Sequence, residues 1–439
     1  MRIVHIAAEA LPFIKVGGLA DVLGSLPQEQ ARRGVEVVVM LPRYRSINGP
    51  LQALGEFSYG FAGASQKARA WRSSYGGVGY LFLETEPDWR EPYQPPEAER
   101  YLRFGSAAAA WLAQYDYDLL HAHDWHAAYA LRLQSRPSVF TIHNLAFQGE
   151  LDPDSFERYS GRRADAELLH EGRVNLMKGA LLAADRVTTV SPRYAREIQT
   201  PEFGMGLDGV LRSISAKLKG ILNGLDTKLW DPANDVHLPQ RYNAQRLELK
   251  RRNRTQMLAI ARLDPGLPTL GAVTRLTRQK GFDLVLQKLP EILNMGLNLI
   301  LVGTGDEDIE AGFAEMAHTY SRRIYFKPAF DEALAHRVYG STDIFLMPSR
   351  FEPCGLSQMI AMRYGTPPVA RATGGLADTI DDGETGILFE EASPQGVFDG
   401  VKRMMAQDRL AMAKKAMQKD FSWGKRVDEY LSLYREALS

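Results

Sequence analysis

The sequence has only one cysteine, Cys354, among its 439 residues. A single cysteine cannot form an intramolecular disulfide, and it excludes zinc sites built from several cysteines. The 53 basic residues cancel the 53 acidic ones, so no net charge attracts the chain to nucleic acid or to an anionic membrane. Glu9 and Lys15 lie where a signal peptide would need apolar residues. We therefore expect a cytoplasmic protein.

Long apolar runs are also missing. No stretch reaches the roughly eighteen apolar residues that span a bilayer, so no membrane partner is expected. Repeats at solenoid periods and low-complexity segments do not occur either. The hydrophobic content of 45% and charged content of 24% are typical of a globular protein. Because the length exceeds the usual span of one hydrophobic core, we expect two or three domains.

Short apolar runs alternate with longer amphipathic stretches. A strand at 2–8, a helix at 19–33 and a strand at 35–41 form a predicted βαβ unit, which implies a parallel sheet. Further strands are predicted at 119–122, 138–142, 186–190, 219–222, 269–274, 297–302, 322–326, 344–347 and 368–370. The polar stretch at about 230–254 separates two series of strands, and its charged end (250–254) is expected to be a solvated helix or linker. The pattern predicts two doubly wound α/β domains that face each other across a cleft.

The first chemical motif is Lys15-Val16-Gly17-Gly18-Leu19, directly after the first predicted strand. Ligands of open parallel sheets bind at the carboxyl ends of the strands. Paired glycines let backbone N–H groups approach a phosphate at the positive end of a helix, and Lys15 adds a charge. The spacing matches neither the dinucleotide fingerprint nor the Walker motif, so a plain Gly-Gly turn with a surface lysine fits equally well.

Histidines follow the next predicted strands. His121, His123, Asp124 and His126 suggest a metal site, but Asp124 follows His123 at once, which is not the spacing of metallo-β-lactamase-like enzymes. We therefore predict no metal there, with a metallohydrolase as a remote alternative. His143-Asn144 comes straight after the strand at 138–142. This pair either caps the loop through hydrogen bonds or projects into the cleft.

The second series of strands carries its own polar motifs. Arg275 and Lys280 flank a turn, and two cations that converge on one point suit a diphosphate leaving group; ordinary surface charge is the alternative. Glu352 precedes a proline, which favours an extended backbone from which the carboxylate can reach a sugar hydroxyl. Gly374-Gly375 opens another predicted helix and repeats the phosphate-binding pattern.

With these motifs the chain resembles the bacterial glycogen and starch synthases. The match runs from the first strand to the last helix and thins at about 51–100 and 152–171. Segments that resemble the family are 15–21, 121–126, 143–149, 190–192, 204–211, 220–226, 275–281, 349–357 and 373–379. The resemblance implies the GT-B fold, with an acceptor-side domain at 1–240, a nucleotide-sugar domain at 241–418 and a C-terminal helix at 419–439 that returns to the first domain.

The resemblance also implies roles for single residues. The implied catalytic residues are His143 (beside the anomeric carbon), Arg275, Lys280 and Glu352. Those implied to bind the donor nucleotide are Lys15, Gly17, Gly18, Phe330 (stacked on adenine), Gly374 and Gly375. Those implied to bind the donor or acceptor sugars are Glu9, Asp21, Asp124, Asn144 and Asn223. Phe330 could instead belong to the core, the commoner fate of a phenylalanine near a strand end.

Two positions depart from related patterns. Many GT-B transferases carry a second glutamate eight residues after the first, and here that position is Ile360, which favours glycogen and starch synthases over sucrose-synthase-like enzymes. The family's pattern is not recognisable around Tyr93, so the resemblance leaves open whether Tyr93 makes the usual sugar contact.

The expected activity is retaining transfer of glucose from ADP-glucose to the non-reducing 4-hydroxyl of an α-1,4-glucan in glycogen synthesis. ADP-glucose is then a co-substrate and glycogen or a malto-oligosaccharide the acceptor, with no metal cofactor and no nucleic-acid partner. The alternatives are a UDP-glucose-using or disaccharide-forming retaining transferase, a non-catalytic glucan-binding protein, and the metallohydrolase.

Overall fold

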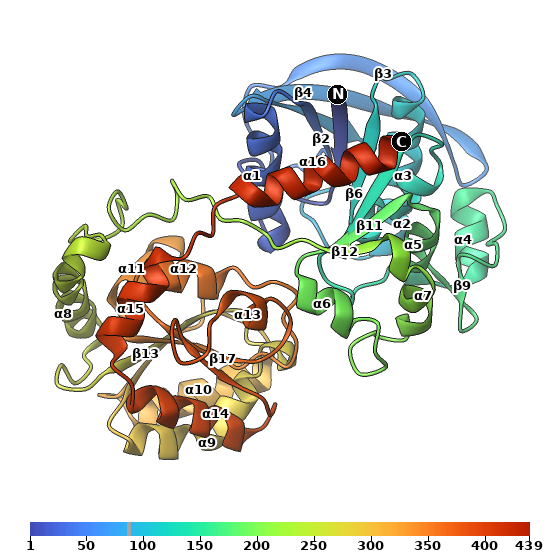
Figure 1. Cartoon of the computed structure of the whole chain (residues 1–439). Coiled ribbons are helices and arrows are strands. Elements are labelled where there is room, and N and C mark those ends of the chain that lie inside the picture. The colour runs from blue at the N-terminus through green and yellow to red at the C-terminus, as the bar shows by residue number, and fades with distance from the viewer. Residues whose placement is uncertain (86–88) are drawn as a thin grey trace. The chain divides into compact units, whose positions relative to one another are not determined.

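The computed structural model of the chain describes residues 1–85 and 89–439 (Figure 1). The chain forms two compact units: unit 1 contains Met1–Gly224 and Ser422–Ser439, and unit 2 contains Leu225–Phe421. The sequence-based boundary at 240 had placed Trp230 and Asp235 in the first domain. Their contacts explain why they belong to unit 2, since Trp230 stacks on His336 with ring centroids 4.2 Å apart and Asp235 accepts a hydrogen bond from the same imidazole at 2.7 Å.

Unit 1 is built on a nine-stranded sheet in the order β12-β11-β7-β6-β1-β2-β5-β4-β3. In chain order these strands are β1 (Arg2–Ile6), β2 (Glu36–Pro42), β3 (Gln52–Phe61), β4 (Ala64–Tyr75), β5 (Val78–Glu84), β6 (Leu119–His123), β7 (Ser138–Ile142), β11 (Arg186–Thr189) and β12 (Leu218–Gly220). From β12 to β5 neighbouring strands are parallel. Every residue of β6 and β7 is buried, as expected for a parallel sheet covered on both faces.

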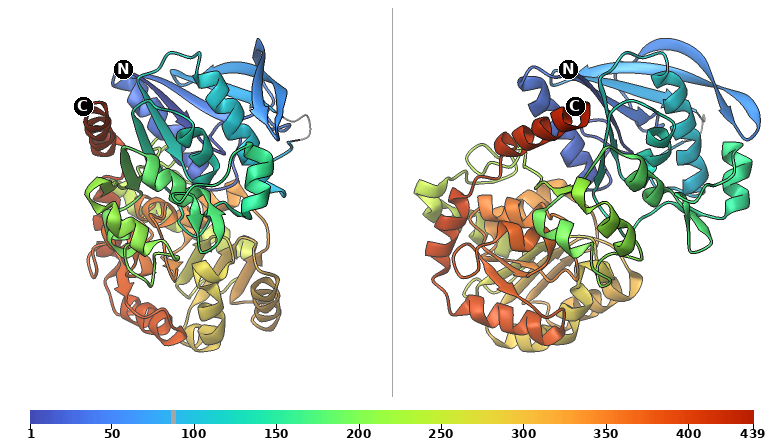
Figure 2. Two further views of the ribbon diagram at one scale, coloured as in Figure 1. Left: turned by 90° about the vertical axis from the view of Figure 1, so that its right-hand side faces the viewer. Right: turned by 45° about the vertical axis from the view of Figure 1, so that its right-hand side comes forward.

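The strands β3 to β5 were not predicted, and they form antiparallel hairpins at one edge of this sheet. Ala62 and Gly63 connect β3 to β4, and Gly76 and Gly77 connect β4 to β5; all four residues have positive φ, between 53° and 82°. Two consecutive residues of this kind form the type I′ turn that suits the twist of a hairpin. Figure 2 shows β3 and β4 as long paired strands.

Helices cover the sheet of unit 1: α1 (Gly18–Arg32), α2 (Glu97–Leu112), α3 (Trp125–Arg132), α4 (Pro153–Ser160), α5 (Leu176–Ala183), α6 (Pro192–Glu197), α7 (Asp208–Ser213) and α16 (Gly424–Leu438). A small second sheet contains β8 (Glu150–Leu151), β10 (Arg173–Asn175) and β9 (Leu169–His170). Helix α16, at the end of the chain, lies against unit 1 beside α1 (Figures 1 and 2). Trp423 Nε1 donates to Ser25 Oγ at 2.7 Å, which fixes the start of α16 on α1.

Unit 2 contains a six-stranded parallel sheet in the order β15-β14-β13-β16-β17-β18. Its strands are β13 (Thr269–Val273), β14 (Asn298–Val302), β15 (Ile324–Lys327), β16 (Ile344–Met347), β17 (Pro368–Arg371) and β18 (Ile387–Phe389). Its α-helices are α8 (Lys250–Ala261), α9 (Phe282–Asn294), α10 (Glu307–Thr319), α11 (Glu332–Ser341), α12 (Ser357–Arg363), α13 (Gly374–Thr379), α14 (Pro394–Met405) and α15 (Arg409–Gln418). Across residues 1–85 and 89–439, no helix has the length and apolarity needed to cross a bilayer.

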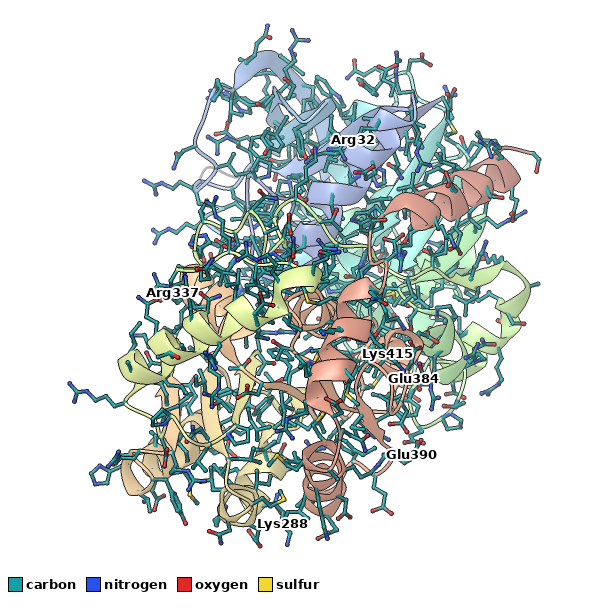
Figure 3. All side chains as sticks on the ribbon, turned by 60° about the vertical axis from the view of Figure 1, so that its left-hand side comes forward. Arg32, Lys288, Arg337, Glu384, Glu390 and Lys415 are labelled. Atoms are coloured by element: carbon teal, nitrogen blue, oxygen red, sulfur yellow. The ribbon has the colours of Figure 1, made fainter. Side chains whose placement is uncertain are left out.

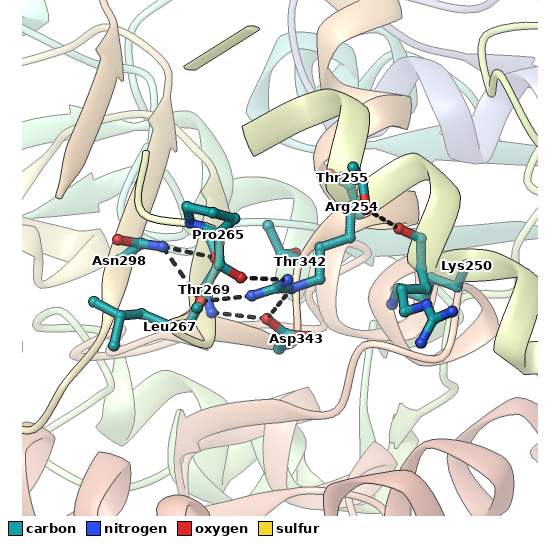
Figure 4. A network of polar contacts seen from close by, with 12 residues as sticks. Lys250, Arg254, Thr255, Pro265, Leu267, Thr269, Asn298, Thr342 and Asp343 are labelled. Carbon is teal, nitrogen blue, oxygen red and sulfur yellow. Dashed lines mark hydrogen bonds and ion pairs between the residues drawn. The ribbon is translucent and has the colours of Figure 1, made fainter. Parts of the chain in front are cut away.

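The charged stretch at 250–254 begins helix α8, but it is not simply solvated as expected. Lys250 Nζ donates to the carbonyl oxygens of Tyr364 and Gly365, each at 2.9 Å. Arg254 Nε donates to Asp343 Oδ2 at 2.9 Å, and its Nη2 donates to Leu267 O at 2.6 Å (Figure 4). Both cations therefore anchor α8 to the body of unit 2.

Candidate active site

The sheet of unit 2 reverses its strand order between β13 and β16, which pair although two strands separate them in sequence. Ligands of doubly wound sheets bind outside the carboxyl ends of the strands at such a reversal. Arg275 and Lys280 follow β13, and Glu352 follows β16. The topology thus brings three of the predicted catalytic residues to one edge of this sheet.

Lys280 and Glu352 form an ion pair at this edge. The Nζ atom of Lys280 lies 2.9 Å from Oε1 and 2.6 Å from Oε2 of Glu352. Ser349 Oγ donates a further hydrogen bond to Oε2 at 2.9 Å. The side chains are only 16% and 6% exposed, respectively. Because each charge compensates the other in a poorly solvated place, the ammonium group is held in a defined position.

Three glycines allow the segments around Glu352 to pack closely. A Cβ atom on Gly281 would lie 2.0 Å from Pro348 O, and one on Gly374 would lie 1.9 Å from Glu352 O; both glycines have positive φ. The N–H group of Gly375 donates to Glu352 O at 3.0 Å. In this structure the Gly-Gly pair therefore supports the glutamate loop, and its contact with a diphosphate stays a prediction.

Arg275 and Phe330 are exposed on unit 2. The guanidinium of Arg275 makes no hydrogen bond or ion pair with the part of the chain that the structure describes, whereas the nearby Arg278 pairs with Asp283 and Asp308. Phe330 is 76% exposed and lies just before α11. The alternative that Phe330 belongs to the core is therefore wrong, because a core ring would be enclosed. Both side chains remain available to a ligand.

The sheet of unit 1 reverses its order between β1 and β6. The loop after β1 carries Glu9, Lys15 and Gly17, the end of β6 carries Asp124, and His143 follows β7. These residues include predicted sugar-binding, nucleotide-binding and catalytic residues of this unit, and each follows one of three adjacent parallel strands. The geometry again matches the place where doubly wound sheets bind ligands.

The carboxylate of Glu9 occupies the backbone donors of the Gly-Gly loop. Its Oε2 accepts hydrogen bonds from the N–H groups of Val16 at 2.5 Å and Gly17 at 2.9 Å. Its Oε1 accepts from the hydroxyl of Tyr93 at 2.9 Å. Burial raises the pKa of Glu9, although these hydrogen bonds oppose the rise. The donors predicted to meet a phosphate are thus bound to a carboxylate of the same unit.

Lys15 and Asp21 form an ion pair, with Nζ and Oδ1 2.8 Å apart. Asp21 lies in the first turn of α1. This helix begins at Gly18, one residue before the predicted start at 19. A negative side chain in this turn interacts favourably with the helix dipole. Lys15 is therefore oriented by α1, and its role towards a nucleotide stays a prediction.

Asp124 connects the ends of β6 and β7. Its Oδ1 accepts from the backbone N–H groups of His143 at 2.7 Å and Asn144 at 3.3 Å. Asp124 has φ 56°, an uncommon conformation for a residue other than glycine that often marks functional sites. Burial raises its pKa to about 7 against the two backbone hydrogen bonds. Asp124 thus fixes the backbone of the predicted His-Asn pair.

The histidines at 121–126 do not gather around Asp124. His126 Nε2 lies 3.1 Å from Glu97 Oε1 on helix α2. His121 and His123 lie in the interior with His5, and ligand nitrogens of these three side chains lie within 4.8 Å of one another. No other metal-sized group of histidines, cysteines or carboxylates occurs in residues 1–85 and 89–439. The metal set considered from the sequence is therefore not the one that the fold assembles.

Two polar residues complete the description of unit 1. Asn223 is buried, and its Oδ1 has no hydrogen-bond partner within the described residues; an unsatisfied buried acceptor is costly unless a ligand supplies a donor. The resemblance leaves the contribution of Tyr93 open, and in the fold it contacts Glu9 and packs edge-on against His126 with ring centroids 5.0 Å apart. Its local sequence gives no signal for these contacts, which arise only in the fold.

Comparisons with known proteins show the family to which the sequence is similar. Residues 2–213 match the family described as starch synthase catalytic domain, and residues 267–407 match the glycosyl transferases group 1 family. The chain is 48% identical to the glycogen synthase of Thermus thermophilus and 39% identical to that of Streptococcus equi subsp. equi, with all of each protein covered.

Solved structures of glycosyltransferases are also similar to this chain. The catalytic domain of starch synthase IV from Arabidopsis thaliana, bound to ADP and acarbose, matches with a TM-score of 0.92 and 33% identity over 99% of both chains. A sucrose-phosphate synthase from Thermosynechococcus elongatus matches with a TM-score of 0.68 and 20% identity, covering 99% of this chain and 98% of that one. The second likeness supports the fold alone.

Proposed function

The chain belongs to the bacterial glycogen and starch synthase family of glycosyltransferases, and we propose that it transfers glucose from ADP-glucose to the non-reducing 4-hydroxyl of an α-1,4-glucan. The observation that carries the proposal is the Lys280–Glu352 pair at the strand reversal of unit 2. A relative that is 33% identical was solved with ADP and acarbose, a nucleotide and an oligosaccharide analogue that correspond to the two substrates. The cytoplasmic location remains a sequence-based prediction.

In this proposal unit 2 stabilises the leaving group. Negative charge grows on the diphosphate as the glycosidic bond breaks, and fixed cations stabilise that charge best because they need not reorganise. Lys280 is fixed by Glu352, and the guanidinium of Arg275 has no partner within residues 1–85 and 89–439. The two cations then do what a divalent ion does in other phosphate sites. Phe330, which is exposed, would stack on the adenine.

Unit 1 would bind the sugars. Its candidate contacts are polar groups at the ends of β1, β6 and β7: Glu9, Asp21, Asp124, His143, Asn144 and Asn223. The Oδ1 atom of Asn223, which has no partner among the described residues, supports this role, because a sugar hydroxyl would donate a hydrogen bond to it. Lys15, Gly17 and Gly18 are proposed to contact the donor phosphates from the same unit, and Gly374 and Gly375 from unit 2. For Gly17 this contact requires its N–H group to leave the Glu9 carboxylate.

The proposed reaction retains the α configuration by attack on the face from which the diphosphate leaves. The bond between the anomeric carbon and the diphosphate oxygen breaks, the acceptor 4-oxygen bonds to the same carbon, and the 4-hydroxyl proton passes to the departing oxygen. The protein then contributes orientation and charge stabilisation, and no side chain needs to act as a nucleophile.

Purified protein should incorporate label into glycogen from radiolabelled ADP-glucose, and more slowly from UDP-glucose. A faster reaction with UDP-glucose would change the assigned donor. Labelled disaccharide in place of labelled polymer would change the assigned acceptor. Binding of glycogen without any transfer from either donor would leave only a glucan-binding protein.

A further inference from the structure

A continuous chain of hydrogen bonds crosses the interior of unit 1 from helix α16 to His143. The Nε2 atom of Gln30 donates to the hydroxyl of Tyr434 at 2.8 Å, and its Oε1 lies 2.8 Å from Nε2 of His5. His5 Nδ1 lies 2.9 Å from Nε2 of His123, and His123 Nδ1 lies 2.9 Å from Nε2 of His143. We call these five residues the histidine relay.

The relay accounts for the buried histidine cluster better than a metal ion does. Both ring nitrogens of His5 and of His123 are engaged within the relay. Those of His121 lie 2.8 Å from the Tyr434 hydroxyl and 2.6 Å from Thr141 Oγ1. A metal ion would need at least three of these nitrogens as ligands and would break the bonds that they make.

Burial keeps the relay neutral at physiological pH. It lowers the pKa of His5 to about 4, against the hydrogen bond that His5 donates to Gln30, and that of His143 to about 3. It also lowers the pKa of His123 well below the ordinary value. A neutral imidazole carries one N–H donor and one bare nitrogen acceptor. If one nitrogen of a ring in the relay donates, the other must accept. The direction of each hydrogen bond therefore fixes the direction of the next one.

The orientation of the Gln30 amide sets that direction. Its Oε1 can only accept, so His5 Nε2 carries the proton and His5 Nδ1 is bare. The bare nitrogen accepts from Nε2–H of His123, whose Nδ1 is then bare as well. His143 must in turn donate from Nε2, which leaves its Nδ1 unprotonated. This Nδ1 has no partner among the described residues, and the side chain is partly exposed.

We propose that Gln30 and Tyr434 are positioning residues that set the tautomer of His143, so that its Nδ1 accepts a hydrogen bond from a hydroxyl of the bound sugar. The sugar contact rests on the proposed function, whereas the tautomer does not. Tyr434 lies on α16 at the end of the chain. The packing of this helix on unit 1 is therefore needed to set the tautomer of His143. If the Gln30 amide were turned over, every bond in the relay would reverse and Nδ1 of His143 would donate instead.

The full chain labelled with ¹⁵N-histidine tests the tautomer directly by NMR, because protonated and bare imidazole nitrogens differ widely in chemical shift. A His143→Gln variant assigns the signals. We expect a bare Nδ1 and a protonated Nε2 at His143 in the wild type. Tyr434→Phe removes the acceptor of the Gln30 amide, so both tautomers should become populated. In glycogen labelling kcat should fall about three- to tenfold, as for one misdirected hydrogen bond, with KM for glycogen nearly unchanged.

Tyr430→Phe is the matched control, since it removes a tyrosine hydroxyl one turn earlier on α16 and outside the relay. It should keep the wild-type tautomer and kcat. A protonated Nδ1 in the wild type, or an unchanged tautomer in Tyr434→Phe, would overturn the proposal. If Tyr434→Phe does not fold, Gln30→Met gives the same readout. A wild type with the expected tautomer but without transferase activity would remove the proposed function and leave the relay standing.

Discussion

The buried ionisable groups at the two candidate binding edges have different partners. In unit 2, charged side chains meet opposite charges, as Lys280 does with Glu352. Arg350 contacts Asp283 through both terminal nitrogens at 2.7 Å. Burial opposes ionisation of Asp283, but the hydrogen bonds and charges of the arginines outweigh it and lower the pKa. At this edge of unit 2 the arginines therefore stabilise the ionised form of the Asp283 carboxyl group.

In unit 1 burial disfavours the charged forms of several side chains instead. The pKa of Glu9 is raised and that of Asp124 reaches about 7, while the pKa of His143 falls to about 3. Backbone N–H groups and neutral imidazoles are the partners of these residues, with few cations among them. Neutral donors and acceptors recognise hydroxyl groups without the desolvation cost of ions. We therefore expect unit 2 to supply most of the leaving-group stabilisation and unit 1 most of the hydroxyl recognition, with Lys15 as the cation that unit 1 contributes.

The largest loss of activity is expected when the Lys280 ammonium group of unit 2 is removed. Lys280→Ala should lower kcat by about 10²–10³, the usual loss for one fixed donor to developing charge, and leave KM for glycogen nearly unchanged. The loss appears in kcat because charge on the diphosphate grows towards the transition state. Steady-state glycogen labelling with saturating ADP-glucose measures it.

Lys288→Ala is the control for this variant. Lys288 lies on α9 of the same unit at the protein surface (Figure 3), where it pairs with Glu291 at 3.2 Å. An exposed ion pair of this kind contributes little, so kcat should stay at the wild-type value. If Lys280→Ala kept kcat within about threefold of the wild type, far less than the loss of such a donor, Lys280 would not stabilise the leaving group.

The next largest effect tests whether Phe330 of unit 2 stacks on the base of the donor nucleotide. Phe330→Ala should raise KM for ADP-glucose about tenfold and reduce its advantage over UDP-glucose, because base–aromatic stacking contributes about 1–3 kcal/mol and a purine offers the larger face. With 76% of the ring exposed, thermal stability should change little. Donor competition and a melting curve of the variant measure both quantities. An unchanged ratio of donors would remove the stacking role.

Much of the fold could be predicted because the central strands are short buried runs. The strands at β7 and β16 were predicted to the residue, and the other predicted strands begin or end within a few residues of the observed ones. The hairpins β3 to β5 were missed since β3 and β4 are half exposed and vary in composition. Gly76-Gly77, between two such runs, was the available signal.

The candidate site was predictable only as a set of strand-end residues. Motifs placed Lys280 and Glu352 at strand ends, but their direct contact depends on the pairing of β13 with β16. The contact of Glu9 with the Gly-Gly loop and the contribution of Tyr93 likewise depend on loop packing. The histidine relay joins residues up to about four hundred positions apart, such as Gln30 and Tyr434, and local patterns carry no such information.

A smaller effect tests the neutral character of unit 1. Asp124 has a folded pKa of about 7 against an ordinary 3.8, so the folded protein binds more protons there between these values and its stability falls as pH rises through this window. Asp124→Asn keeps the acceptor for His143 N–H and removes the titration. The free energy of unfolding of this variant relative to that of the wild type should therefore be about 2 kcal/mol higher at pH 8 than at pH 5.

Urea denaturation of both proteins at the two pH values measures this gain. Asp116→Asn serves as control, because that side chain is 86% exposed and its variant should track the wild type. Equal pH dependence of the wild type and Asp124→Asn would show that Asp124 is ionised in the fold at pH 5.

The last prediction is that a chelator has no effect on activity. It tests whether the cations of unit 2 act without a metal ion. EDTA should leave glycogen labelling unchanged, because Lys280 is already fixed and Arg275 is free to meet the diphosphate. The histidine nitrogens of unit 1 that come closest to a metal set are all engaged in hydrogen bonds. The assay compares chelated protein with protein given excess Mg²⁺ after chelation. Loss of turnover that Mg²⁺ restores would mean that a divalent ion, and not the lysine–arginine pair, neutralises the leaving group.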